Sequence, residues 1–140
     1  MAQRLKVFQS LWAMEQRVPG LPEDPPEHWL DRIAAAGFDG VCVDQGFEDI
    51  DDTLALQPLI EARNLGVRVN AFPATLAEMT PLLEMARDMN AVCVNAIVQV
   101  MPLTVDEGVE VVERSRADAK AIGVDLLFEN HRDCTLNDLY

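Results

Sequence analysis

The sequence predicts an α/β fold in which parallel β-strands alternate with α-helices. One phrase occurs four times along the chain: a helical segment ends in Gly or Asn, and a short β-branched run follows at once. The segments between these runs have the apolar period of helices. Strand-helix alternation with short connections produces a parallel sheet with helices outside it. The strand-like runs recur about every 24 to 34 residues, the usual length of one such unit.

The first expected elements are a strand over residues 5–13, a Pro-rich loop over 15–25 and a helix over 26–36. The N-terminal segment lacks the apolar region and cleavage site of a signal peptide. No run of 18 or more apolar residues occurs, so no membrane span is expected. We therefore expect a cytoplasmic protein.

Four further strands are expected within the recurring phrases. Gly or Asn just past a helix takes the left-handed conformation that closes the helix. The apolar runs that follow are short and nearly continuous, which is typical of strands buried on both faces. The four phrases cover residues 35–44, 65–72, 89–96 and 122–129.

The helices between these strands have recognisable starts. Thr75 and Thr104 each stand three residues before a Glu, the pattern of a capping box, and a further helix is expected over residues 53–64. Pro58 and Pro81 lie early in their helices and can shift the starts. Residues 135–140 are expected to form the first turn of another helix. In the helix after Thr104, one apolar stripe is expected from Val105, Val109, Val112, Ala119 and Ile122.

The strand order fits either an open doubly wound sheet or a closed (β/α) barrel. An open sheet normally has a glycine-rich phosphate-binding turn after its first strand, and residues 9–15 contain no glycine. We therefore predict a barrel of the TIM type, with residues 1–140 as a single domain. Complete barrels need at least about 200 residues and eight strands. The chain is thus expected to be incomplete, with about five strands and four helices, either as the N-terminal portion of a longer barrel, which we favour, or as a half-barrel that assembles with a partner or a second copy.

Composition excludes some partners. The chain has 11 Lys and Arg against 24 Asp and Glu, a net charge of −13. Such a surface repels nucleic acids, whose binding depends on basic side chains that neutralise phosphates. Cys42 and Cys93 lie in apolar runs, where a free thiol behaves as a small hydrophobic side chain. Cys134 lies in a loop near His131 and is given no catalytic role.

Candidate site residues follow from the position of active sites in barrels, where strands end and the next loops begin. Glu129 ends the fifth strand, and period-two alternation directs Glu129 and His131 to the same side, into the barrel mouth. A carboxylate and an imidazole there can bind a divalent metal or transfer a proton. The alternative is a structural ion pair between Glu129 and Arg132 or a basic residue of a neighbouring loop. The polar residues at the five strand ends are Gln9, Trp12 and Glu15; Asp44 and Gln45; Asn70; Asn95 and Gln99; and Glu129, Asn130, His131, Arg132 and Asp133.

The segment Phe128-Glu129-Asn130-His131-Arg132-Asp133 resembles the Glu-x-His segment of the xylose-isomerase-like barrels. Gly37-Phe38-Asp39-Gly40-Val41 and Asn64-Leu65-Gly66-Val67 are similar to phrases of the same superfamily. The superfamily includes sugar isomerases and epimerases, hydroxypyruvate isomerase, inosose dehydratases and endonuclease IV proteins. The resemblance extends over the whole chain, as the first half of a family member.

This resemblance implies a role for Glu129 as ligand of a divalent metal (Mn, Mg, Co or Zn) and as a base. Further ligands would come from strands six to eight, so a metal is expected only in a complete barrel. Glu129 and His131 are thus the expected catalytic residues. The substrate pocket is expected to be lined by Trp12, Asn70, Asn95, His131 and Arg132. Trp12 can also be a plain core residue.

The expected function is part of a metal-dependent isomerase or epimerase that acts on a small sugar, polyol or hydroxy-ketone through an enediolate. Two alternatives remain open: a dehydratase or lyase of the same superfamily, and a non-catalytic half-barrel that serves assembly or binding. The 140-residue chain alone is expected to be inactive. The endonuclease branch is disfavoured, because it needs several early His ligands and the chain has only His28 and His131.

Overall fold

Five parallel strands form one sheet in the order β1-β2-β3-β4-β5, which is also their order along the chain. The computed structural model describes residues 4–14, 20–45, 49–99 and 104–129. The strands are β1 Phe8–Ser10, β2 Gly40–Gln45, β3 Gly66–Ala71, β4 Val94–Ala96 and β5 Leu126–Phe128. The helices are the short 3₁₀ helix η1 Trp12–Met14, then α1 Pro26–Ala35, α2 Ile50–Ala55, α3 Gln57–Glu61, α4 Leu76–Asp88 and α5 Val105–Ile122. The predicted α/β class is confirmed.

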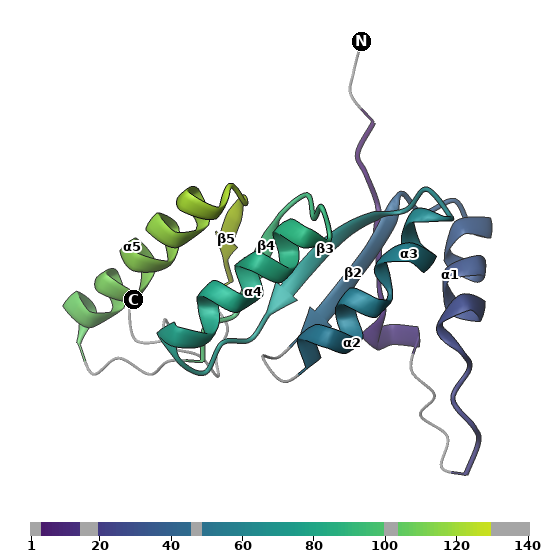
Figure 1. The fold of residues 1–140 in the computed structure, drawn as a ribbon, viewed down its shortest axis with the longest axis horizontal. Coiled ribbons are helices and arrows are strands. Elements are labelled where there is room, and N and C mark those ends of the chain that lie inside the picture. Colours follow the sequence, from purple (N-terminus) through teal and green to yellow (C-terminus); the bar gives the residue numbers. More distant parts are fainter. Residues whose placement is uncertain (1–3, 15–19, 46–48, 100–103, 130–140) are drawn as a thin grey trace.

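The core lies between the sheet and the helices α1 to α5, which run along the sheet in Figure 1. Alternate strand residues point into this core and are fully buried. From the helix side, large apolar side chains of α1, α3 and α4 meet them. The strand members are Val41, Val43, Val67, Val69, Ala71, Val94 and Ala96, and the largest helix members are Leu30, Ile33, Ile60, Met79, Leu82, Leu83 and Met85.

Residues 37–40 connect α1 to β2 and also contact β1 and β3. Gly37 closes α1 with φ of 82°, a conformation that glycine adopts without steric cost. Asp39 binds the start of β1, because its carboxylate accepts from the Val7 backbone N–H at 2.8 Å and pairs with Arg4. A Cβ at Gly40 would lie 2.3 Å from the Gly66 carbonyl oxygen and 2.4 Å from the Phe8 ring. Glycine is therefore required at position 40, where the Phe8 ring covers the sheet.

The left-handed helix ends expected from the sequence are confirmed at Gly37, Asn64, Asn90 and Gly123, with φ of 82°, 53°, 53° and 86°. In the second phrase, Asn64 takes this conformation. Gly66, two residues later, is the first residue of β3. Only Leu65 therefore separates the left-handed residue Asn64 from the start of β3.

Two expected elements differ from the prediction: one is shorter, and the other is divided into two helices. The first strand was expected over residues 5–13, but β1 covers Phe8–Ser10 and the chain then turns into η1. The expected helix over 53–64 is divided into α2 and α3, with Leu56 as the C-cap of one and the N-cap of the other. Pro58 has no N–H to donate to the carbonyl four residues earlier, so the helical hydrogen bonds are interrupted there.

The capping boxes differ in outcome. At α5, the Glu107 N–H donates to Thr104 Oγ1 at 3.2 Å and the Thr104 N–H donates to Glu107 Oε2 at 3.1 Å, so the predicted box is confirmed. At α4, the Thr75 side chain makes no capping bond to the backbone. Glu78 instead accepts from the Ala74 N–H at 2.8 Å and from Thr75 Oγ1 at 3.1 Å. The helix begins after Thr75 as expected, but the predicted capping box is not formed.

The predicted stripe of α5 was wrong in its first turns. Val105 is 57% exposed and Val109 is also exposed. The buried residues of this helix are Gly108, Val111, Ser115 and Ala119. The small side chains of Gly108, Ser115 and Ala119 let α5 approach α4 closely, whereas Val105 and Val109 lie outside this buried face.

The strands were expected to be buried on both faces. Among the described strands, this is confirmed only for the first four residues of β2, Gly40–Val43. In β3 and β4, buried residues alternate with half-buried ones. The half-buried residues share one face of the sheet, opposite the helices, which the described residues only partly cover. We call this second face the inner face, because it would face the interior of the predicted barrel.

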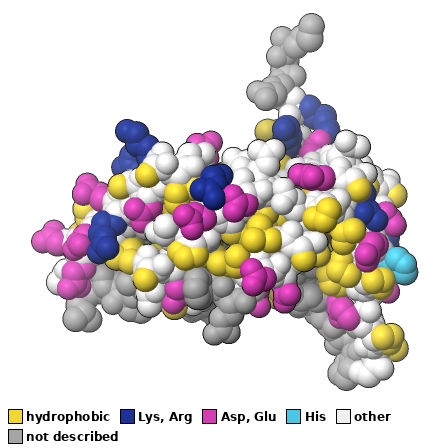
Figure 2. Space-filling view, viewed as in Figure 1, with side chains coloured by type: hydrophobic (Ala, Val, Ile, Leu, Met, Phe, Trp, Pro, Cys, Tyr) yellow, Lys and Arg dark blue, Asp and Glu magenta, His cyan; other side chains and the backbone are white. Residues whose placement is uncertain are grey.

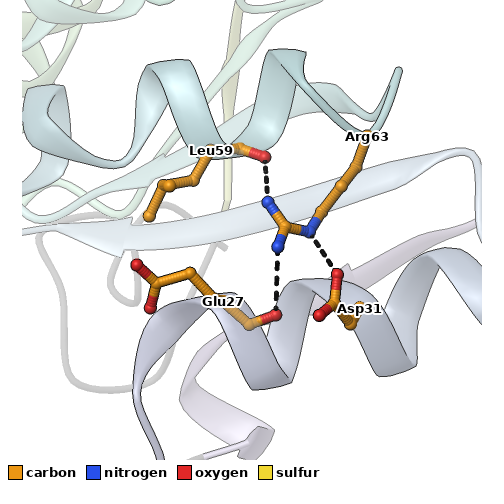
Figure 3. A network of polar contacts seen from close by, with 4 residues as sticks. All are labelled: Glu27, Asp31, Leu59 and Arg63. Atoms are coloured by element: carbon orange, nitrogen blue, oxygen red, sulfur yellow. Dashed lines mark hydrogen bonds and ion pairs between the residues drawn. The ribbon is translucent and has the colours of Figure 1, made fainter.

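Polar contacts on the outer helices add to the packing. The Arg63 guanidinium donates to Asp31 Oδ1 at 2.7 Å, to the Leu59 carbonyl at 2.8 Å and to the Glu27 carbonyl at 3.4 Å (Figure 3). It thereby joins α1 to the end of α3. On the face shown in Figure 2, Asp and Glu side chains are spread between hydrophobic ones, in line with the net charge of −13.

Residues 135–140, expected to begin another helix, lie outside the described residues. In the part of the chain that the structure describes, no helix has the length and apolar character needed to cross a membrane.

Candidate functional site

A chain of hydrogen bonds connects one polar side chain from each of the five strands or their ends. Ser10 Oγ donates to Asp44 Oδ2 at 2.8 Å, and Asn70 Nδ2 donates to Asp44 Oδ1 at 2.6 Å. Asn95 Nδ2 donates to Asn70 Oδ1 at 3.3 Å and to Glu129 Oε2 at 2.7 Å. We call these five residues, Ser10, Asp44, Asn70, Asn95 and Glu129, the polar row.

The strand register explains why these side chains meet. Asp44, Asn70 and Asn95 stand directly opposite one another on β2, β3 and β4. Ser10 is opposite Cys42, two residues before Asp44, and Leu127 is opposite Asn95, two residues before Glu129. Since side chains two residues apart lie on the same face of a strand, all five point to the inner face.

The sequence-predicted site residues have three outcomes. Asn70, Asn95 and Glu129 are brought together in the polar row, as expected for residues at neighbouring strand ends. Trp12 lies in η1 directly after β1 and is 57% exposed, so it is not a buried core residue. His131 and Arg132 lie outside the described residues, and their expected roles stay predictions.

Two members of the polar row were given no role from the sequence. Asp44 was among the polar residues at strand ends but was not assigned to the site. Ser10 was overlooked because the first strand was expected to end at residue 13, whereas β1 ends at Ser10. The sequence did contain one usable signal. Side chains alternate between the two faces of a strand, so aligning the ends of the five strands would have placed Ser10 and Asp44 on the same face as Glu129.

Three further strand-end residues that the structure describes, Gln9, Gln45 and Gln99, are not part of the row. Gln9 is opposite Val41, and Gln45 is opposite Ala71, so both belong to the face that the helices cover. Gln99 is exposed beyond β4, where its backbone N–H donates to the Pro73 carbonyl at 2.9 Å. Glu15, Asn130 and Asp133 lie outside the described residues.

The polar row offers oxygen ligands of the kind that hard divalent cations prefer, in the carboxylates of Glu129 and Asp44. Glu129 fits the expected metal ligand, since it ends β5 on the inner face and Asn95 holds one of its oxygens. Among the described residues, no group of three His, Cys, Asp or Glu side chains is placed to hold a metal. The expected role of Glu129 as a metal ligand therefore stays a prediction.

Cys42 lies on the inner face two residues before Asp44, opposite Arg68 of β3, and is itself buried. Burial of Cys42, and secondly the nearby Asp44 carboxylate, raises the pKa of that thiol from 9.0 to about 11, against an opposing effect of Arg68. Cys42 is therefore a neutral, inert thiol at physiological pH, as expected for a small hydrophobic residue.

One hollow in the described part of the chain lies away from the polar row. It has a volume of about 760 Å³ and lies where the end of α5 meets β5, between residues such as Arg116, Lys120 and Asp125. It is wide open and follows the outer edge of the last described strand. The hollow thus lies beside the edge strand β5, whereas the side chains of the polar row lie on the inner face.

No protein-family model matches the sequence, and no curated protein matches it. Solved structures do. A crystal structure of D-psicose 3-epimerase in the presence of D-fructose is similar with a TM-score of 0.64 and 12% identity, over 91% of this chain and 55% of the epimerase. A sugar phosphate isomerase/epimerase from Parabacteroides distasonis has a TM-score of 0.62 and 12% identity, over 90% of this chain and 51% of that one.

A xylose isomerase domain protein from Planctomyces limnophilus is similar with a TM-score of 0.60 and 14% identity. The similarity covers 97% of this chain and 59% of that protein. The chain thus spans about half the length of the structures that it matches. At these identities the likeness concerns the fold. The chain therefore shares its fold with about half of each of these structures, as an incomplete parallel (β/α) barrel.

Proposed function

We propose that this chain is part of a divalent-metal-dependent isomerase or epimerase that acts on a small sugar, polyol or hydroxy-ketone. The reaction is a proton transfer at a carbon next to a carbonyl, through an enediolate. The observation that supports the proposal best is the position of Glu129: its carboxylate ends β5 on the inner face, and Asn95 donates to it at 2.7 Å. The sugar isomerase/epimerase-like fold supports the same class of reaction.

In this mechanism Glu129 would be one ligand of the divalent ion, and its carboxylate would take the carbon-bound proton and return it to the substrate. The ion, when bound, supplies positive charge that stabilises the developing negative charge on the substrate oxygens. Asn95 orients the Glu129 carboxylate before substrate arrives, which removes the cost of ordering it during the reaction. The half-buried position of the polar row limits access of water and strengthens these interactions.

The substrate would lie over the polar row, with Trp12 at its rim. An exposed aromatic ring beside a polar pocket suits the apolar face of a sugar ring. Asn70 and Asn95 direct their amide nitrogens toward carboxylates, so their contact with substrate would be made beside those bonds. His131 and Arg132 complete the proposed pocket, with His131 as a second proton-transfer group.

The direct test is Glu129→Gln in the protein that contains the complete barrel. Removal of the carboxylate charge should weaken Mn²⁺ binding and lower turnover on keto-sugars, each by at least about 100-fold. Mn²⁺ affinity is measured by electron paramagnetic resonance, and turnover by product chromatography, which also distinguishes an epimerised sugar from a dehydrated product.

The matched control is Glu113→Gln, an exposed glutamate of α5. It should leave both quantities unchanged. Equal Mn²⁺ affinity and turnover in Glu129→Gln and the unaltered protein would eliminate the proposed role of Glu129. The 140-residue chain by itself should show no turnover.

A further inference from the structure

We infer that Asp44 is a positioning residue for Glu129, acting across two intervening strands through Asn70 and Asn95. The inference rests on the proposed function in one respect, the role of Glu129 as metal ligand and base. The coupling itself follows from which atoms in the polar row can donate a hydrogen bond and which can accept one.

The first step is the orientation of Asn70. An ionised carboxylate only accepts hydrogen bonds, so the atom of Asn70 that lies 2.6 Å from Asp44 Oδ1 must be the amide nitrogen. The amide oxygen of Asn70 consequently faces the other way, toward Asn95 on β4. Ser10 Oγ donates to the second Asp44 oxygen at 2.8 Å, so the carboxylate is held from both sides.

The second step is the orientation of Asn95. Its amide nitrogen has two protons, and they go to Asn70 Oδ1 and to Glu129 Oε2. If the Asn70 amide were reversed, its nitrogen would face the nitrogen of Asn95, donor against donor. Asn95 would then have to turn away, and its bond to Glu129 would be lost or bent.

The bonds differ in strength along the row. The contacts to carboxylates are short, 2.6 to 2.8 Å, as expected for charge-assisted hydrogen bonds. The amide-amide contact between Asn95 and Asn70 is the longest at 3.3 Å. It is therefore the link through which Asp44 reaches Glu129, and the one that limits the coupling. All five side chains are half-buried, so water competes only partly for these bonds.

Asn95 holds Oε2 of Glu129 through an amide, which fixes the orientation of that oxygen without adding a charge of its own. Asp44 stabilises that amide arrangement from two strands away.

The test uses the 140-residue chain with ¹⁵N-labelled Asn and follows exchange of the Asn side-chain amide protons with water by NMR. Asp44→Ala removes the acceptor, so the Asn70 and Asn95 side-chain protons should exchange about 5- to 10-fold faster, the factor expected for one lost hydrogen bond. Asp44→Asn retains an acceptor oxygen and should restore slow exchange at Asn95. Asp51→Ala, an exposed aspartate of α2, is the control and should change neither residue.

The backbone N–H of Val69, which donates to the Cys93 carbonyl, reports whether the sheet is intact. If Val69 exchange also accelerates in Asp44→Ala, the comparison is repeated with Asp44→Leu, which restores side-chain volume. Faster exchange at Asn70 alone, with Asn95 unchanged, would overturn the inference, because the effect would stop one strand short of Glu129. Loss of Val69 protection in both variants would overturn it too, by showing a structural role for Asp44.

These outcomes are separate from the test of the proposed function. A row that couples Asp44 to Asn95 in a protein that binds no Mn²⁺ would contradict the metalloenzyme alone. Conversely, Mn²⁺ binding that depends on Glu129 while Asn95 is indifferent to Asp44 would contradict the positioning role alone.

Discussion

The two faces of the sheet are built from the same five strands but have opposite character. On the outer face, Val69, Val94 and Ala96 are completely buried under the helices. Asn70, which follows Val69, and Asn95, which stands between Val94 and Ala96, lie on the inner face. Both are half-buried and donate hydrogen bonds to carboxylates. Period-two alternation separates the two roles along a single strand. The outer face stabilises the fold, and the inner face is available for chemistry.

The inner face is itself divided from one end of the strands to the other. At the amino ends, the Phe8 ring packs on Gly40 and closes the face. In the middle lies the buried Cys42, and at the carboxyl ends lies the polar row. The hydrogen-bonded row of polar side chains therefore lies at the carboxyl ends, where parallel barrels bind their ligands.

The largest expected effect separates the two faces directly. Leu83 of α4 is 0% exposed, and Leu127 of β5 on the inner face is 51% exposed. Leu83→Ala should lower the free energy of unfolding by about 2–5 kcal/mol, because it leaves a cavity in the core. Leu127→Ala should cost under about 1 kcal/mol. Urea denaturation of both variants measures this, and equal losses would mean that the inner face is packed as tightly as the outer one.

A smaller effect is expected at the closed end of the inner face. Gly40→Ala places a Cβ against the Gly66 carbonyl oxygen and the Phe8 ring, so we expect a loss of about 1–3 kcal/mol. Gly66→Ala is the matched control, since its Cβ would make ordinary contacts at 3.4 Å or more. Thermal unfolding of the two variants compares them. A Gly40→Ala protein as stable as Gly66→Ala would show that Phe8 does not close this end.

The smallest effect at neutral pH concerns Cys42. Its raised pKa of about 11 should make its thiolate about 100-fold rarer at pH 8 than for a thiol of pKa 9.0, and its reaction with a disulfide reagent correspondingly slow. The measurement uses a chain with Cys93→Ser and Cys134→Ser, so that one thiol remains, with the same chain unfolded in urea as the control.

The pH dependence has a defined sign. The pKa of Cys42 is higher in the folded chain than in the unfolded one, so its contribution to stability is complete below pH 9.0 and is lost as pH rises toward about 11. Native-state reactivity equal to that of the unfolded chain would show that the inner face is open to water at Cys42.

Part of the site was predictable and part was not. Glu129, Asn70 and Asn95 were accessible because each ends a recognisable apolar run, and parallel strand ends meet at one edge. Ser10 was not, because apolar residues continue beyond it to Ala13, and nothing local shows that the chain leaves the sheet at Leu11. The helix over 53–64 was predicted as one element because periodicity does not reveal a missing N–H at Pro58.

The sequence by itself determined the alternation of strands and helices, the left-handed helix ends at Gly37, Asn64, Asn90 and Gly123, and the capping box at Thr104. These depend on interactions within a few residues, which local sequence specifies. The tertiary structure alone decided that Asp44 and Glu129 are joined through Asn70 and Asn95, and that Val105 and Val109 are exposed while Gly108 is buried. Those outcomes depend on strand register and on how closely helices approach, and both are set by packing between residues far apart in the chain.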